Sequence, residues 1–207
     1  MPLLTALFGT ALLMGLGVSL VLMGTAETTL ARRDRDARSL ARAAHAIVTL
    51  AVADLRAMPS WAGVLQPGSL PELSAVPGRL APDSMASVLP WGGVMDLRVA
   101  TSRVQAGTDA DGVPGDPSTW RLYGVSSLAA LVPEGAGGSP CFLAVWVADD
   151  PVDGDGDPST DKNGVILVRG VAFGPGEGEA TVSLTVSREA AGGGHDVVRV
   201  LTIRPGR

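Results

Sequence analysis

Cysteine is almost absent from this chain. Among 207 residues only Cys141 is a cysteine, so no disulfide can form within the chain. Cys141 opens the apolar run "CFLAVWVA", and a lone cysteine in such a run is typical of a small buried hydrophobic residue. We therefore expect Cys141 to lie in a hydrophobic core.

Histidine is nearly as scarce, since His45 and His195 are the only two. The first falls on a helical stretch and the second in a glycine-rich turn, so the sequence predicts no histidine metal cluster and no histidine partner for Cys141. A triad that used His195 and Asp196 would also need a serine on a strand-turn-helix elbow, which the sequence lacks. We expect no enzymatic activity and no small-molecule substrate.

Charged residues are sparse as well, at 18% of the chain, and the net charge is −5. The basic residues of the C-terminal half are scattered and are not interleaved with aromatic residues, so no nucleic-acid partner is expected. Aromatic residues make up only 4% of the chain. We expect the tryptophans to anchor the core or the loops rather than to form a carbohydrate platform; they are Trp61, Trp91, Trp120 and Trp146.

What the chain does have is a long apolar run near its N-terminus. Residues 3–23 carry no charge and supply the roughly twenty apolar residues that a bilayer-spanning helix needs. Two interpretations are open: a retained membrane anchor, or a signal peptide cleaved after Ala26. The length of the run and the absence of a preceding basic residue favour the anchor.

The helical pattern continues beyond the apolar run. Residues 25–58 contain neither proline nor glycine, and apolar residues recur there at three- and four-residue steps. The sequence thus predicts one helix over residues 3–57, which Pro59 ends because proline disfavours a helical conformation in the residue before it. Residues 59–95 have no sustained period and are expected to form an ordered loop.

Short β-rich runs separated by turn residues follow from Val94 onward. Their succession favours an antiparallel meander, whose one apolar face would pack on the amphipathic half of the helix. The expected fold class is α+β, divided into a membrane-spanning half-helix (1–26), an amphipathic half-helix (27–58), a loop (59–95) and a β-domain (96–207). We expect six strands, within residues 94–104, 120–132, 141–148, 165–174, 180–189 and 197–204.

The segment "DDPVDGDGDPSTDKNG", residues 149–164, concentrates aspartates at one bend. Calcium prefers six to eight oxygen ligands, and alternating aspartates can turn successive carboxylates inward. The spacing differs from the helix-loop-helix calcium motif, since Pro158 and Gly164 occupy positions where that motif has a turn glycine and a glutamate. A solvated Asx-rich turn is the alternative. The candidate calcium ligands are Asp153, Asp155, Asp157, Asp161 and Asn163.

The stretch "LVLMGTAETTLARRDRDARSLARAAHAIVTLAVADLR", residues 20–56, resembles the N-terminal region of PilX-type pilus assembly proteins, and the match extends back to Gly9. The tract 145–175 is similar to an Asp-rich hairpin near the C-terminus of some of these proteins. One helix that is half membrane span and half sheet-packing, followed by an antiparallel sheet, is also the layout of type IV pilins.

The resemblance implies a structural minor pilin-like subunit of a type IV pilus or of a related type II secretion pseudopilus. Its N-terminal helix would pack with other pilin-like subunits, and its β-domain would be exposed on a surface filament. Basic residues beside a membrane span predict its cytoplasmic side, so the arginines in 32–38, taken alone, would predict that the residues after the span lie in the cytoplasm. The resemblance instead implies a membrane-anchored protein with an extracytoplasmic C-terminal domain.

The chain departs from the major pilins at its start. Major pilins have a glutamate at the fifth position of the mature chain, but a count from Met1 finds Thr5 there, and no prepilin peptidase site is visible. We expect either a true start upstream of Met1 or an accessory subunit that is inserted without such processing. The alternative function is a secreted calcium-binding adhesion module released after Ala26.

Overall fold

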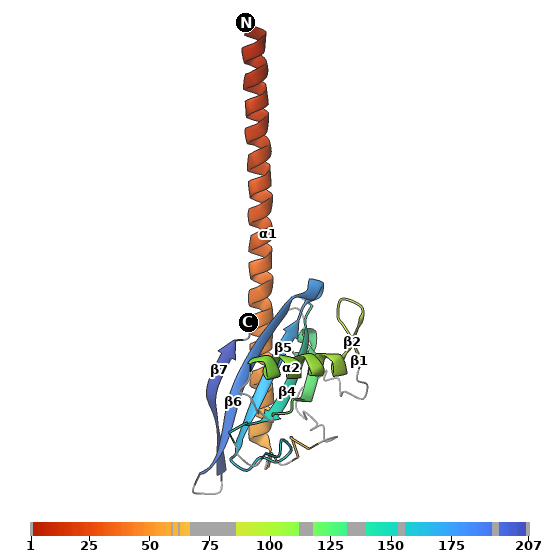
Figure 1. The fold of residues 1–207 in the computed structure, drawn as a ribbon, viewed down its shortest axis with the longest axis vertical. Coiled ribbons are helices and arrows are strands. Elements are labelled where there is room, and N and C mark those ends of the chain that lie inside the picture. The colour runs from red at the N-terminus through yellow and green to blue at the C-terminus, as the bar shows by residue number, and fades with distance from the viewer. Residues whose placement is uncertain are drawn as a thin grey trace. The chain divides into compact units, whose positions relative to one another are not determined.

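The computed structural model describes residues 2–58, 60–61, 63–66, 86–111, 118–131, 140–152, 156–191 and 195–205. The chain divides into two compact units, Met1–Arg38 and Ser39–Arg207, which we call the N-terminal unit and the globular unit. A long N-terminal helix and an antiparallel sheet make this an α+β fold, as the sequence predicts (Figure 1).

Helix α1, Pro2–Ala57, is continuous over 56 residues and confirms the single helix expected from the sequence. In the N-terminal unit its apolar side chains are exposed, with Leu3 84% and Met14 74% accessible to solvent. The helix is long and apolar enough to cross a membrane, although a signal sequence would meet the same criterion. The part of α1 that belongs to the globular unit begins at Ser39.

The main sheet of the globular unit has five strands, each antiparallel to its sequence neighbour. This arrangement confirms the meander, with five strands in the sheet where six were expected. The 3₁₀ helix Pro175–Glu177 lies in the connection between the strands Val165–Phe173 and Glu179–Ala191. The strands are β3 (Arg121–Ser127), β4 (Phe142–Asp149), β5 (Val165–Phe173), β6 (Glu179–Ala191) and β7 (His195–Pro205).

One face of the sheet packs on the C-terminal part of α1. Small residues of the helix, Ala44 and Ala51, are fully buried there and allow a close approach to the strands. Gly170 of β5 lies directly beneath the helix, where an added Cβ would be 2.2 Å from Val48 Cγ2. The core also contains Cys141, which is 1% exposed, so the expectation of a buried cysteine is confirmed.

The opposite face is covered by helix α2, Leu97–Asp111, which corrects the sequence-based expectation of a strand over 94–104 and of a polar sheet face. Asp96 Oδ1 accepts a hydrogen bond of 2.8 Å from Arg98 N, which satisfies an amide at the start of the helix. Leu97, Ala100 and Val104 then follow at helical spacing and pack on the sheet. Because both faces are covered, β4 is buried along its whole length and reads as an unbroken apolar run.

The segment 59–95 was expected to be a loop, but its described part contains a small hairpin. Strand β1, Ala86–Val88, pairs with β2, Val94–Asp96, in antiparallel register. Gly92 and Gly93 both have φ of +91° in the connection, a conformation that L side chains rarely adopt. A one-turn helix, α3 (Leu128–Leu131), follows β3.

Three tryptophans anchor the elements of the globular unit, in the role that the sequence predicts. Trp146 Nε1 donates to Thr101 Oγ1 at 2.9 Å, and Trp120 Nε1 donates to Thr108 Oγ1 at 2.7 Å, so both tie α2 to the sheet. Trp61 Nε1 donates to Leu55 O at 3.0 Å at the end of α1. Each indole is buried and has a partner for its N–H.

Candidate functional site

The Asp-rich bend connects β4 to β5, as its position between two apolar runs predicts. Of the five candidate calcium ligands, Asp157, Asp161 and Asn163 are described by the structure, while Asp153 and Asp155 lie outside the described residues. The structure therefore describes the second half of the candidate calcium site.

The Asp157 carboxylate accepts hydrogen bonds from the residues that immediately follow it. Its Oδ1 accepts from Ser159 N at 3.0 Å and from the Ser159 hydroxyl, and its Oδ2 accepts from Thr160 Oγ1 at 2.9 Å. These bonds, the Ser159 hydroxyl first, lower the pKa of Asp157 below its ordinary value, because they stabilise the charged form. Asp157 thus closes an Asx turn within the loop.

Asp161 and Asn163 shape the entry into β5. Asp161 Oδ1 accepts from Gly164 N at 2.7 Å, and Asn163 Oδ1 accepts from Val165 N at 2.7 Å. Asn163 Nδ2 also reaches back to Asp150 Oδ2 at 3.3 Å, which joins the two ends of the loop. The described half of the loop is therefore built as a series of side-chain-to-backbone turns.

The structure places Asp157, Asp161 and Asn163 in one loop, where each side chain accepts a hydrogen bond from a backbone N–H group. Among the residues that the structure describes, no group of three or more His, Cys, Asp or Glu side chains is placed to hold a metal ion. Calcium binding by Asp153, Asp155, Asp157, Asp161 and Asn163 stays a prediction.

Replacement of Asp155 and Asp157 by alanine tests that prediction. If the loop binds calcium, saturating calcium is expected to raise the Tm of the unchanged chain by about 5 °C and to leave that of the double variant unshifted. Thermal unfolding of both proteins, with calcium and with a chelator, measures the difference. An Asp34→Ala/Asp36→Ala variant removes the same charge elsewhere and is the matched control. An equal calcium shift in all three proteins would rule out this ion site.

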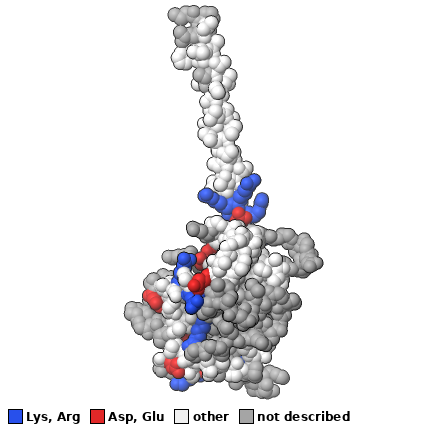
Figure 2. Space-filling view, turned by 90° about the vertical axis from the view of Figure 1, so that its right-hand side faces the viewer, with Lys and Arg blue, Asp and Glu red and all other residues white. Residues whose placement is uncertain are grey.

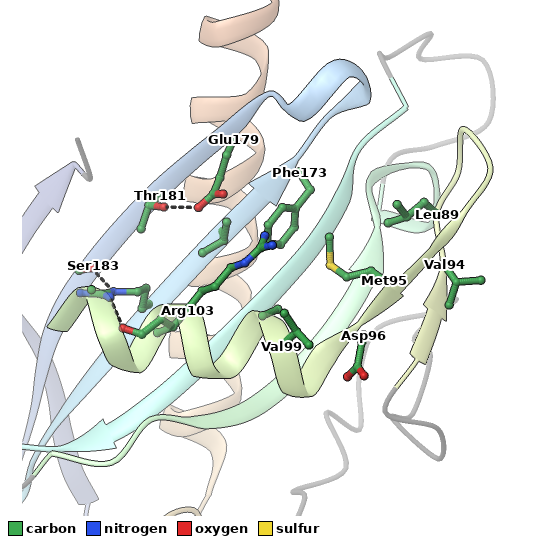
Figure 3. A pocket seen from close by; sticks show the side chains of 15 residues that line it. Leu89, Val94, Met95, Asp96, Val99, Arg103, Phe173, Glu179, Thr181 and Ser183 are labelled. Carbon is green, nitrogen blue, oxygen red and sulfur yellow. Dashed lines mark hydrogen bonds between the residues drawn. The ribbon is translucent and has the colours of Figure 1, made fainter. Parts of the chain in front are cut away.

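A second candidate is a groove on the α2 side of the sheet (Figure 3). It has a volume of about 510 Å³ and lies among α2, the β1–β2 hairpin, β5 and β6. Its walls are partly apolar, with Met95, Val99 and Phe173, and Arg103 reaches from α2 toward Phe173 (Figure 3). Glu179 and Thr181 lie on the β6 side.

The groove offers apolar surfaces for packing and charged side chains for electrostatic interactions. Arg169 Nε donates to Ser183 Oγ at 3.1 Å, its Nη1 donates to Val104 O at 3.3 Å, and its guanidinium stacks 4.6 Å from the centre of the Trp120 ring. Arg169 therefore ties α2 to the sheet. The residues described around the groove include neither His nor Cys, so they offer no histidine base or thiol nucleophile.

Sequence reasoning missed this groove and the residues that line it. The missing step was the recognition of α2, because the groove exists only where a helix crosses the second face of the sheet. The spacing of Leu97, Ala100 and Val104 was the available signal.

Comparisons with protein-family models, with curated proteins and with solved structures find no match. The resemblance of residues 20–56 to PilX-type proteins therefore stays a prediction.

Proposed function

We propose that this protein is a membrane-anchored, pilin-like minor subunit of a type IV pilus or of a related type II secretion pseudopilus. The observation that carries the proposal is the division of α1 into two chemically different parts. The first part exposes an uncharged apolar surface, and the last part is a core element of an antiparallel-sheet domain. A filament subunit needs both: a helix that is stored in a membrane and then packs with others, and a folded domain that stays outside.

Gly17 and Gly24 of the N-terminal unit support helix packing between subunits. A Cβ added at either position would meet nothing within 4 Å, so packing within the described chain does not explain their small size. Small residues allow close approach of apolar helices in membranes. Gly17 and Gly24 are seven residues apart and therefore lie on the same side of the helix.

A Gly17→Leu/Gly24→Leu variant tests this packing. In a filament subunit the added side chains would separate neighbouring helices, so incorporation into sheared surface filaments is expected to fall by about tenfold or more, which corresponds to about 1.4 kcal/mol of lost packing. The apolar run is made more hydrophobic, so the amount of protein in membranes is expected to stay unchanged.

Gly15→Leu is the matched control, because it adds the same side chain on a different side of the helix. Quantitative immunoblots of the membrane and filament fractions compare the two variants. Equal incorporation of the double variant and of the unchanged protein would contradict helix packing through this face.

A further inference from the structure

A group of arginines follows the apolar run in the N-terminal unit. Arg32, Arg33, Arg35 and Arg38 are all exposed, and we call them the arginine collar. Figure 2 shows basic side chains on both sides of the helix just beyond its uncharged length. The inference below rests on the proposed membrane anchoring of α1.

The collar surrounds the helix instead of forming a stripe. At 3.6 residues per turn, successive residues are rotated by about 100°, so Arg33, Arg38 and Arg35 lie about 100°, 240° and 300° around the helix from Arg32. A folded protein partner that binds beside a helix needs charge on one side. A headgroup layer surrounds a spanning helix on every side, and the collar matches that geometry.

The charge of the collar is available for a ligand. Asp34 pairs with Arg38 at 2.7 Å. Among the described residues, Arg32, Arg33 and Arg35 form no ion pair. Residues 32–38 hold four arginines and two aspartates, a net charge of +2 in a chain whose total is −5.

The collar also lies at a suitable depth. Residues 2–26 carry no charge, so the hydrocarbon boundary can fall as late as Ala26, and the backbone of Arg32, Arg33 and Arg35 then follows about 9, 11 and 14 Å further along the helix. A headgroup layer is about 5–7 Å thick on each side, and long arginine side chains can reach back toward it. Near this boundary, the hydroxyls of Thr25, Thr28 and Thr29 donate to helix carbonyls, so these side chains keep partners as α1 leaves the hydrocarbon.

We propose that the arginine collar binds the phosphate groups of anionic lipids and thereby fixes the depth of α1 in the membrane before the subunit is extracted into a filament. The interaction is electrostatic, so it weakens as salt rises. Neutralisation of one arginine near a membrane surface is worth about a fivefold change in binding.

Native mass spectrometry of the full-length protein in detergent tests the proposal. The protein is offered equimolar phosphatidylglycerol and phosphatidylcholine, and the bound lipids are counted. Phosphatidylglycerol is expected to dominate, and in an Arg32→Gln/Arg33→Gln/Arg35→Gln variant the preference is expected to fall by about tenfold or more. The corresponding Lys variant is expected to retain most of it. The matched control, Arg98→Gln/Arg199→Gln/Arg204→Gln, removes three exposed arginines of the globular unit and is expected to behave as the unchanged protein.

Three outcomes would overturn the proposal: equal binding of the two lipids, an equal loss in the control variant, or displacement of phosphatidylglycerol by millimolar inorganic phosphate, which would indicate a site for the free ion. Extraction of membranes at alkaline pH tests the membrane anchor separately from lipid recognition. If the protein stays in the membrane but does not distinguish the lipids, the collar inference alone fails. If the unchanged protein leaves the membrane, the proposed anchor fails.

Discussion

Replacement of Gly170 by alanine is expected to destabilise the globular unit by about 3 kcal/mol. The new Cβ would lie 2.2 Å from Val48 Cγ2 and 3.1 Å from the backbone oxygen of Ala44. Val48 is β-branched and has one strongly preferred rotamer in a helix, so it cannot swing aside without strain. The whole C-terminal part of α1 would have to move away from β5. Urea unfolding of the full-length protein, followed by tryptophan fluorescence, measures the loss.

Two further variants make this test specific. Gly107→Ala makes the same chemical change in α2, where an added Cβ meets nothing within 4 Å, and is expected to stabilise the unit by about 0.5–1 kcal/mol. Val48→Ala removes the atom nearest to the added Cβ. The Gly170→Ala/Val48→Ala double variant is therefore expected to lose less stability than the sum of the losses in the two single variants. A Gly170→Ala variant as stable as the unchanged protein would contradict the close approach of α1 to the sheet.

Replacement of Arg188 by methionine is expected to cost about 3 kcal/mol, because Arg188 holds the C-terminal end of α1. Its Nη2 donates to Leu55 O at 3.1 Å and also to Met58 O, and its guanidinium stacks 4.6 Å from the centre of the Trp61 ring. A cation at this end also interacts favourably with the helix dipole. Methionine keeps much of the side chain's length but none of these interactions.

Arg199→Met is the matched control, since Arg199 pairs with Glu189 at 3.3 Å but its side chain is 61% exposed. Exposed ion pairs contribute little, so this change is expected to cost under about 1 kcal/mol. Arg188→Lys keeps the charge without the planar fork and should fall between the two. Hydrogen exchange of the last turn of α1 adds a local measurement. An Arg188→Met variant as stable as the Arg199→Met variant would show that the contacts of Arg188 with the end of α1 contribute little to stability.

The elements that could be read from the sequence are those whose pattern is local. The absence of proline and glycine over residues 25–58 is enough to predict the C-terminal part of α1, and turn clusters separate the strands of the meander. The sequence predicts a strand in place of helix α2 because its valines favour β-structure, while the Asp96 cap and the helical spacing that follows it favour a helix. Its contacts with Trp120 and Trp146 are made only in the folded unit.

The candidate sites were predictable to different degrees. The Asp-rich bend falls where the sequence places it, and its aspartates alone indicate a polar turn. The backbone N–H groups that donate to the Asp157 and Asp161 carboxylates are determined by the fold of the loop, so the sequence alone does not predict them. The groove beside Arg103 joins residues from four elements, so the helical spacing of α2 alone is not enough to predict it.

The mass of the N-terminal peptide of the native protein, from membranes and from sheared surface filaments in parallel, tests the central claim most directly. The pilin-like account predicts a peptide that retains the "LLTALFGTALLMG" stretch, present in both fractions. A chain that begins at Glu27 and is found free in the medium would contradict it and leave the secreted module in its place.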